Sequence, residues 1–526
     1  MSAVFSLPFK SAALMLCLVL PWLFGYTSTP TRDWWPWLFS AICAVAVALA
    51  WGRVTAQLLA ATWLAAALIS SLIGLLQYFG GGQHWMQPWL IQIGPAEAFA
   101  NLRQRNQFAS LSSIGLAALL ACVAWRVPAL PGQPARPAPK VIPAWAWTAA
   151  VLLALGNAVS SSRTGLLQWG LLLLLVLWWH WASRRALVWL TALALLAYLL
   201  ALQAMPALLR LFMDVDAASL YARVAQAGTD SRLVLWSNML TLIAQKPWLG
   251  WGWGELAYAH FMTAYPGARF AELLGNAHNL PLHLAVTLGI PAALLACIAA
   301  GWVVRAARPW RERDVGRQMA WSVLAVIGLH SLLEYPLWYG PFQLAVLLCA
   351  GWLWPTRKAS CGSKRLPRAG RLTTSALVLS LLGLGWAGVE YWRVSQLLRA
   401  PAANYLSSSA GTPLARAKDS WLFSRQVQFA ELVTTEVTPA NALYVHALAQ
   451  RVLHDSPEPL VIEQLLVSAQ LAGAQVNEAE VAHVLDRYAH ANPRAHALWV
   501  QKNAPLLQSA ASKAPSTAPA SATSSR

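Results

Sequence analysis

The sequence predicts an all-α polytopic membrane protein with about 11 to 12 transmembrane helices, a large loop on the outer face and a helical C-terminal domain. Three observations carry this prediction. Of 526 residues, 58% are hydrophobic and only 11% charged, whereas soluble proteins are about a quarter charged. Apolar runs of spanning length recur along the chain. Basic residues gather in alternate loops. A disordered chain is excluded, and a single soluble domain is disfavoured.

The apolar runs define the expected spans. A bilayer core about 30 Å thick needs roughly 20 mainly apolar residues per helix. Eleven runs qualify, near residues 8–27, 34–51, 55–79, 107–126, 143–160, 165–182, 186–204, 278–304, 318–335, 340–355 and 372–393. The count becomes twelve if part of loop 80–106 or loop 205–277 returns into lipid. Lys10 precedes an apolar run without a small-residue cleavage pattern, which favours a retained first helix over a signal peptide.

The basic residues give the expected orientation. With the N-terminus inside, the cytoplasmic segments hold 18 basic residues, and the only acids among them are Glu312 and Asp314. The 18 are Lys10, Arg53, Arg126, Arg136, Lys140, Arg184, Arg185, five arginines in 305–317 and six basic residues in 357–371. Nearly all of the net charge of +18 therefore follows the positive-inside rule. It reflects topology, so no nucleic-acid partner is expected.

Composition divides the chain into three parts. Residues 1–395 form the expected transmembrane domain, which includes outer loop 205–277. Residues 396–505 are less apolar and show helical amphipathic spacing in 442–453, 460–472 and 478–489, which indicates a small helical domain. Residues 506–526, rich in Ala, Ser, Pro and Thr, are expected to be disordered. The six cysteines show no CxxC pattern, so neither a disulfide framework nor a zinc site is indicated.

Polar clusters on the outer face are the candidate sites, because polar groups at membrane depth are costly. Residues 101–107 (Asn-Leu-Arg-Gln-Arg-Asn-Gln) lie at the mouth of a spanning helix. They are either a solvated helix cap or a phosphate site, since helix N-termini and guanidinium groups both bind anions. Arg163 lies in a serine-rich corner, and Arg232 starts an amphipathic helix. Each is either an ordinary snorkelling arginine or part of the site. A third interpretation, that of a partner for Asp230, applies to Arg232 alone.

The richest cluster combines two segments. Residues 278–283 (His-Asn-Leu-Pro-Leu-His) open one expected span and residues 330–339 close another on the same face. An isolated histidine here would be an ordinary core residue, but His278, Glu334 and Tyr335 are expected at one membrane level. The arginines suit a polyprenyl diphosphate leaving group. A neutral histidine could take a proton from an acceptor hydroxyl, a contribution of roughly 100-fold to 10,000-fold.

These motifs resemble a known family. Residues 230–236, the run 246–254 (Lys-Pro-Trp-Leu-Gly-Trp-Gly-Trp-Gly) and His278-Asn279-x-x-Leu282 followed by Gly289 resemble the O-antigen ligase and polymerase superfamily. The resemblance spans about residues 150–350. Within that superfamily, residues 101–107 and 330–336 are similar to PglL-type bacterial protein O-oligosaccharyltransferases, also called pilin glycosylases.

The resemblance implies a GT-C-like membrane glycosyltransferase of the bacterial inner membrane. It implies en bloc transfer of a glycan from undecaprenyl diphosphate to Ser or Thr hydroxyls of periplasmic proteins such as pilin. It also implies a periplasmic active site and C-terminal domain, and no metal or other cofactor.

The resemblance also assigns residues. It places the catalytic histidine at His278, with Asn279 beside it. The donor-diphosphate residues that it implies are Arg163, Arg232, Arg103, Gln104 and Arg105. Supporting residues without an assigned chemical role are Glu334, Tyr335 and His330. His283 lies five positions after His278, so it points elsewhere on the helix and is expected to pack.

Four alternatives to a protein O-oligosaccharyltransferase stay open. An O-antigen ligase would use a lipid A core acceptor, and an O-antigen polymerase would extend the glycan on its carrier. A transporter of the lipid-linked glycan would also need arginines, but transporters usually place polar groups near the midplane of internally repeated halves. A non-catalytic scaffold would explain the C-terminal domain but not the clustered His and Arg residues.

Overall fold

The computed structural model describes most of the chain. The described residues are 9–28, 31, 33–81, 89–126, 142–180, 183–215, 230–354, 371–397, 414 and 417–513. Within these ranges the secondary structure consists of α-helices and short 3-10 helices, without a strand. The chain divides into two compact units. This agrees with the predicted all-helical class.

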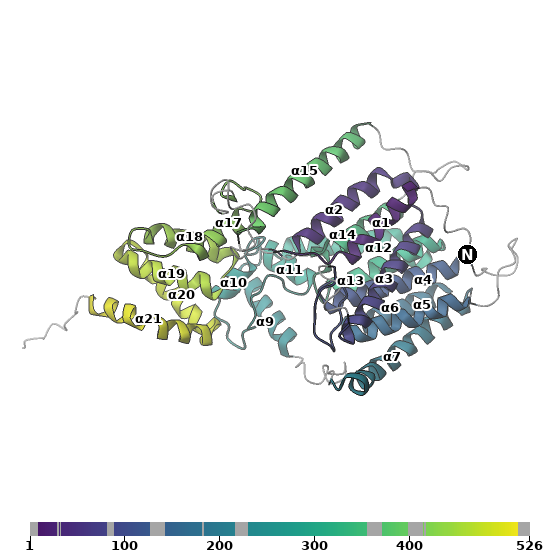
Figure 1. The fold of residues 1–526 in the computed structure, drawn as a ribbon, viewed down its shortest axis with the longest axis horizontal. Helices are drawn as coiled ribbons and strands as arrows, with labels where there is room; N and C mark the ends of the chain where they lie inside the picture. Colours follow the sequence, from purple (N-terminus) through teal and green to yellow (C-terminus); the bar gives the residue numbers. More distant parts are fainter. Residues whose placement is uncertain are drawn as a thin grey trace, which may run out of the picture. The chain divides into compact units, whose positions relative to one another are not determined.

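The first unit comprises residues 1–230, 278–283 and 294–395, and Figure 1 shows its helices gathered in a bundle. The bundle helices are α1 (Phe9–Leu23), α2 (Trp34–Leu49), α3 (Ala56–Tyr78), α4 (Arg105–Ala124), α5 (Ala144–Ser160), α6 (Arg163–His180), α7 (Arg185–Met213), α13 (Val315–Ser331), α14 (Gly340–Leu353) and α15 (Arg371–Ser395). Short 3-10 helices are η1 (Trp51–Arg53), η2 (Pro309–Arg311) and η3 (Pro336–Trp338).

Helix α4 forms the centre of this bundle, because 94% of its apolar window is buried. It packs on α3, α5, α6 and α13. Small residues allow the close approach: a Cβ on Gly115 would lie 2.3 Å from the Cβ of Ala67. The polar residues at the start of α4 are therefore held inside the bundle among the ends of several helices.

The eleven predicted runs each contain a helix, with two differences. The run predicted at 278–304 is two helices, α11 (Leu280–Leu288) and α12 (Ile290–Ala307), which are separated at Gly289. Helix α7 continues through Pro206 to Met213, nine residues beyond its predicted end. Proline is tolerated inside membrane helices because neighbouring groups satisfy the freed carbonyl.

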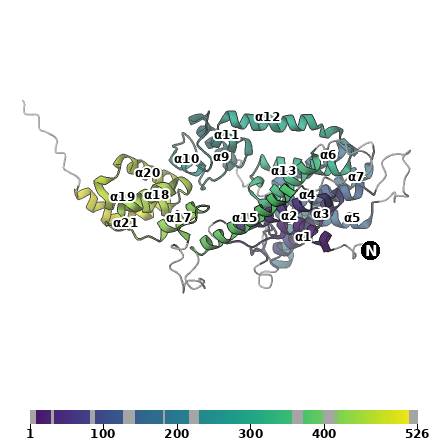
Figure 2. The same ribbon diagram turned by 90° about the horizontal axis from the view of Figure 1, so that it is seen from above.

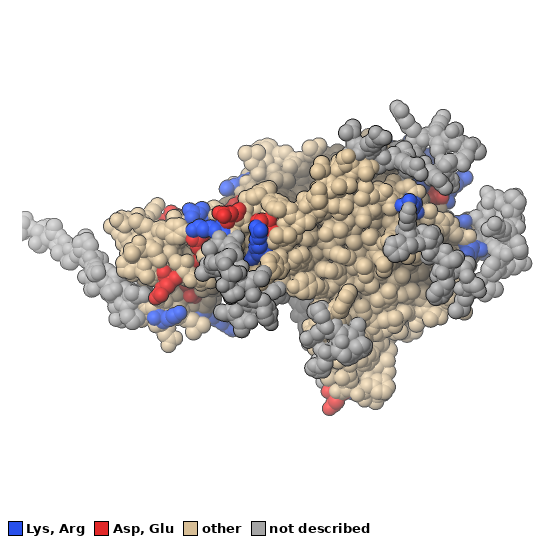
Figure 3. All heavy atoms as spheres, turned by 45° about the horizontal axis from the view of Figure 1, so that its top comes forward, with Lys and Arg blue, Asp and Glu red and all other residues tan. Residues whose placement is uncertain are grey.

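The apolar helices support a polytopic membrane protein. Five described helices are long and apolar enough to cross a membrane, and their ranges are Ala56–Tyr78, Arg105–Ala124, Arg185–Met213, Ile290–Arg311 and Thr374–Ser395. Four shorter apolar helices are Ala12–Leu23, Trp34–Leu49, Ala144–Ser160 and Gly340–Leu353. On the face drawn in Figure 3, the middle of the bundle is a broad surface without charged side chains. The predicted total of 11 to 12 spans stays a prediction.

The second unit comprises residues 231–277, 284–293 and 396–526. Its described helices are α9 (Asp230–Gln245), α10 (Leu256–Met262), α17 (Ser424–Thr434), α18 (Ala442–Asp455), α19 (Pro459–Ala472), α20 (Glu478–Ala491) and α21 (Pro493–Lys513), with 3-10 helix η5 (Gly473–Gln475). Figure 2 shows α18 to α21 stacked together. Phe261 of α10 joins the hydrophobic core of the C-terminal helices. Loop 205–277 and the C-terminal segment therefore share a core.

The C-terminal helices match the predicted pattern. Helices α18, α19 and α20 confirm the three amphipathic stretches, whereas α17 and α21 were not predicted. Helix α21 continues to Lys513, into the range that the sequence predicts to be disordered, and residues 514–526 lie outside the described part. The predicted domain boundaries stay predictions. All five described cysteines are free, and Cys361 lies outside the described residues.

Candidate active site

His278 precedes helix α11 and is fixed there by its neighbour. Asn279 Oδ1 accepts a hydrogen bond of 3.0 Å from the Leu282 amide, which caps the start of α11. Asn279 Nδ2 donates to the Leu332 carbonyl at 3.0 Å, just past the end of α13. His278 itself has a φ of 50°, an uncommon conformation for a residue other than glycine. Segments 278–283 and 330–339, which were predicted to converge, are therefore joined by a hydrogen bond from the Asn279 side chain to the backbone at Leu332.

Glu334 is the partner of His278. The distance from His278 Nδ1 to Glu334 Oε2 is 2.9 Å. Two amides donate to the same carboxylate, Gln104 Nε2 to Oε2 at 3.1 Å and Asn106 Nδ2 to Oε1 at 3.3 Å. The residue is buried. An ionised carboxylate can accept all three hydrogen bonds, whereas a protonated one would have to donate one itself.

This arrangement determines the tautomer that the network favours. If Nδ1 of His278 carries the proton and donates it to Glu334, the lone pair lies on Nε2. The Tyr335 ring lies edge-on to the imidazole, with ring centroids 5.0 Å apart. The imidazole is thus held on one side by a carboxylate and on another by an aromatic ring. Such a histidine can act as a general base through Nε2.

Asn106 connects this pair to helix α6. Its Oδ1 accepts a hydrogen bond of 2.7 Å from Ser162 Oγ. Ser162 Oγ in turn accepts from the Gly165 amide at 3.1 Å, which caps the start of α6. Asn106 belongs to the motif at 101–107, but the sequence pattern indicates no particular role for Asn106 or for Ser162. The available signal was a polar residue at the mouth of a buried helix.

A second polar layer lies deeper in the bundle and holds α4, α6 and α13 together. Ser110 Oγ lies 2.9 Å from His330 Nδ1. Gln168 Nε2 donates to Ser110 Oγ at 2.7 Å and to the Val326 carbonyl at 3.2 Å. Its Oε1 accepts from Ser113 Oγ at 3.0 Å. His330 is fully buried, so in this structure it contributes to the scaffold behind the Glu334 network.

Aromatic residues cover the α13–α14 connection. Tyr335 stacks on Tyr339 with ring centroids 5.9 Å apart. His283 is buried and lies edge-on to Trp338 at 5.0 Å. His283 therefore packs, as its spacing from His278 predicts.

Two of the predicted donor arginines have acidic partners. Arg103 Nη1 lies 3.2 Å from Asp33 Oδ1, and Arg105 forms an ion pair with Glu97. Both arginines are partly exposed. A diphosphate that used them would compete with these carboxylates. Their role in donor binding stays a prediction.

The other two predicted arginines lie in different units. Arg163 is exposed at the first position of α6, directly after Ser162. A guanidinium group beside a helix N-terminus favours an anion at this position. Arg232 is partly buried in the first turn of α9, in the second unit. The structure links Arg163 to the Glu334 network through Ser162, and the role of Arg232 stays a prediction.

Three family models match the chain. "Virulence factor membrane-bound polymerase, C-terminal" matches residues 318–506, "O-Antigen ligase" matches residues 148–298, and "Protein glycosylation ligase" matches residues 98–121. The last range contains the motif at 101–107, and the first two contain Glu334 and His278.

Two curated relatives come from Acinetobacter baylyi. The general O-oligosaccharyltransferase is 25% identical over 348 residues, which cover 63% of this chain and 56% of the relative. The ComP-specific O-oligosaccharyltransferase is 25% identical over 143 residues, which cover 27% of this chain and 26% of the relative. The chain thus spans about half the length of the first relative and a quarter of the second.

The fold and the matches indicate the class of protein that the chain resembles. An apolar helical body with a histidine and a carboxylate at its helix ends, together with the matched O-antigen ligase region, makes the chain similar to the O-antigen ligase superfamily. Within that superfamily the similarity is to the PglL type, the protein O-oligosaccharyltransferases, as the match over α4 and the first relative indicate.

Proposed function

We propose that the protein is an O-linked oligosaccharyltransferase. In this proposal it transfers an oligosaccharide en bloc from undecaprenyl diphosphate to Ser or Thr hydroxyls of periplasmic proteins such as pilin. The reaction takes place at the periplasmic face of the bacterial inner membrane. The observation that carries the proposal is the His278–Glu334 pair, at 2.9 Å, held by Asn106 beside the start of α6.

The proposed step needs a base and an anion site. Nε2 of His278 takes the proton of the acceptor hydroxyl while its oxygen attacks the anomeric carbon of the glycan. The bond from that carbon to the diphosphate oxygen breaks, and its electron pair leaves with the diphosphate. Glu334 keeps the imidazole in the reactive tautomer and stabilises the imidazolium that forms, as a buried carboxylate does in serine hydrolases. The lipid tail of the carrier stays in the bilayer throughout.

Guanidinium groups are suited to neutralise the leaving diphosphate. Arg163 is the best supported, because the adjacent Ser162 is linked through Asn106 to the carboxylate that binds His278. Arg232 belongs to the proposal as a second contributor from α9. Metal independence also belongs to the proposal, because the arginine side chains would take the place of a metal ion in neutralising the diphosphate. A chelator should then leave the transfer rate unchanged.

The names of the relatives support a protein acceptor. Both are named O-oligosaccharyltransferases, one general and one specific for ComP. The proposal extends this kind of acceptor to the present chain. The O-antigen ligase and polymerase matches favour two second candidates with the same donor chemistry, a ligase that uses lipid A core and a polymerase that uses a second carrier-linked glycan.

Purified full-length protein separates these candidates. It would be incubated with lipid-linked oligosaccharide together with a pilin-like protein, lipid A core, or neither. We expect a mass increase on the pilin-like protein equal to one whole glycan. Modification of lipid A core alone, or longer glycans on the carrier alone, would replace the protein acceptor by one of the two candidates. Movement of the donor across vesicles without any transfer would instead support transport.

A further inference from the structure

An apolar groove lies at the end of α6 that is far from His278. Trp178 follows Arg163 by 15 residues on α6, a rise of about 22 Å at 1.5 Å per residue. The groove has a volume of about 490 Å³. Its lining residues are Leu174, Leu175, Trp178, Trp179, Pro309 and Trp310. It is therefore distinct from the site around Glu334, which is linked to the other end of α6 through Asn106 and Ser162.

Hydrogen bonds fix the wall of the groove and satisfy the indole N–H groups of its two α6 tryptophans. Trp178 Nε1 donates to the Trp310 carbonyl at 3.0 Å, and Trp179 Nε1 donates to the Pro309 carbonyl at 3.0 Å. Both indole N–H groups are thus satisfied within the protein. Leu174 is 64% exposed and Trp178 is 69% exposed, so the apolar wall faces outward. A hydrocarbon chain is the ligand that such a surface fits.

Arginines flank the η2 side of the groove. Arg308 and Arg311 adjoin Pro309 and Trp310 in sequence, and both are exposed, as is Arg313. In the part of the chain that the structure describes, no carboxylate forms an ion pair with any of these three side chains. Three positive charges therefore stand beside an apolar surface without an acidic partner.

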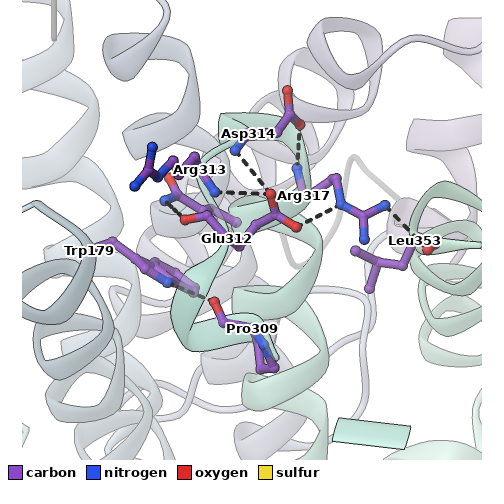
Figure 4. A network of polar contacts seen from close by, with 8 residues as sticks. Trp179, Pro309, Glu312, Arg313, Asp314, Arg317 and Leu353 are labelled. Carbon is purple, nitrogen blue, oxygen red and sulfur yellow. Dashed lines mark hydrogen bonds and ion pairs between the residues drawn. The ribbon is translucent and has the colours of Figure 1, made fainter. Parts of the chain in front are cut away.

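The acids of the same loop are already engaged (Figure 4). Glu312 Oε2 accepts from Arg317 Nε at 2.7 Å, and Glu312 Oε1 accepts from the backbone amides of Arg313 and Asp314. Asp314 Oδ1 accepts from the Arg317 amide at 2.9 Å and caps α13. Glu312 and Asp314 thus stabilise the loop and the start of α13, and they do not neutralise the exposed arginines.

We propose that this groove binds an anionic glycerophospholipid of the membrane. An acyl chain lies along Leu174 and Trp178, and the headgroup phosphate meets the guanidinium groups of Arg308 and Arg311. Apolar pockets with a basic rim between membrane helices suit this class of lipid. A zwitterionic lipid brings its own cation beside the arginines and binds less well. The polyprenyl diphosphate donor is not the occupant, because its chemistry belongs to the far end of α6.

A photoreactive lipid tests the proposal directly. Full-length protein in zwitterionic detergent micelles would be irradiated with phosphatidylglycerol that carries a photoreactive acyl chain, then digested and mapped by mass spectrometry. We expect adducts on 174–179 and 309–311. Unlabelled phosphatidylglycerol should compete about tenfold better than phosphatidylcholine, the order expected when two arginines contact the headgroup. Adducts spread evenly over other exposed apolar residues, such as Leu295 and Ile298 on α12, would overturn the proposal.

Variants separate the headgroup from the groove. Arg308→Gln with Arg311→Gln should abolish the preference for phosphatidylglycerol, and Leu174→Trp should block the adducts by filling the groove. The control is Arg53→Gln with Arg126→Gln, which also removes two positive charges from the predicted cytoplasmic loops and should leave the preference intact. Equal competition by phosphatidylcholine in the unmodified protein, stronger competition by a polyprenyl diphosphate, or loss of preference in the control would each contradict the site.

Discussion

At the scale of single residues, the site depends on one buried carboxylate. Glu334 accepts from His278, Gln104 and Asn106, so its position is set by the start of α4 and by the segment before α11. The left-handed conformation of His278 is consistent with a backbone held by its surroundings. In the proposed mechanism, Glu334 is a positioning residue that acts through the imidazole.

Glu334→Gln should lower the turnover number of glycan transfer about 100-fold to 10,000-fold, because an amide can donate to Nδ1 and stabilise the unreactive tautomer. The Michaelis constant for donor should change little. A matched control is Glu390→Gln, which alters another buried carboxylate of the first unit, paired with Arg393 at 3.1 Å. Steady-state kinetics of the two folded variants would check this. Equal losses in both would contradict the role of Glu334.

His260 provides a pH test in the second unit. It is buried, and desolvation together with the nearby Arg269 charge lowers its pKa from 6.5 to about 4. Nδ1 lies 2.8 Å from Tyr265 Oη, and Nε2 lies 3.0 Å from the Phe270 carbonyl. A carbonyl only accepts, so Nε2 donates and Nδ1 accepts from the tyrosine hydroxyl. The neutral ring therefore satisfies both partners.

Because the folded pKa lies below the unfolded value, the unfolded state binds more protons between pH 6.5 and 4. The stability due to neutral His260 is complete above about pH 6.5 and is lost as the pH falls toward 4, by at most about 3 kcal/mol. Hydrogen exchange of residues 256–270 should accelerate from pH 7 to pH 5 after correction for intrinsic rates. His260→Gln should flatten this dependence, whereas exposed His490→Gln should not. An unchanged dependence in His260→Gln would refute the assignment.

At the scale of elements, the break between α11 and α12 is built by two glycines, Gly289 and Gly250, which pack against each other's segments. The Trp251 amide donates to the Val286 carbonyl at 2.9 Å, and the Ile290 amide donates to the Pro247 carbonyl at 2.8 Å. A Cβ on Gly289, whose φ is 90°, would lie 2.1 Å from the Trp248 carbonyl oxygen. The loop 246–252 thus closes the end of α11 by backbone contacts that leave no room for a side chain.

Gly289→Ala should destabilise this junction by roughly 2 to 4 kcal/mol, since it adds a backbone clash to an unfavourable positive φ. Gly301→Ala, inside the following helix α12, is the matched control, because a Cβ there meets nothing within 4 Å and alanine favours helix. Thermal unfolding in detergent and hydrogen exchange of 246–252 would compare them. Equal unfolding of both variants would contradict a backbone clash at Gly289.

Much of the helical organisation is readable from hydropathy, because lipid demands long apolar segments. Hydropathy does not predict the break at Gly289, because the sequence is apolar on both sides of it. The break is caused by the close approach of Gly289 to Trp248. The site is readable only in part. Its residue types mark His278 and Glu334, but the link from Glu334 to Asn106 joins positions 228 residues apart. No spacing rule predicts such a contact.

At the scale of the whole molecule, the basic loops predict which side of the membrane each segment faces. In a cysteine-free background, Leu443→Cys on exposed α18 should react with an impermeant maleimide in spheroplasts. Arg313→Cys, in the loop between α12 and α13, should react only after lysis. Labelling of Arg313→Cys in intact spheroplasts would reverse the topology and place the groove at the outer face.

The most direct test of the account is the rate of glycan transfer to a protein acceptor by purified His278→Ala beside His283→Ala. Both histidines belong to one short segment, but His278 lies 2.9 Å from Glu334, whereas the His283 ring packs on Trp338. The account predicts that His278→Ala loses at least about 100-fold in rate while His283→Ala keeps most of it. A folded His278→Ala protein with the rate of the unmodified enzyme would contradict the proposed mechanism.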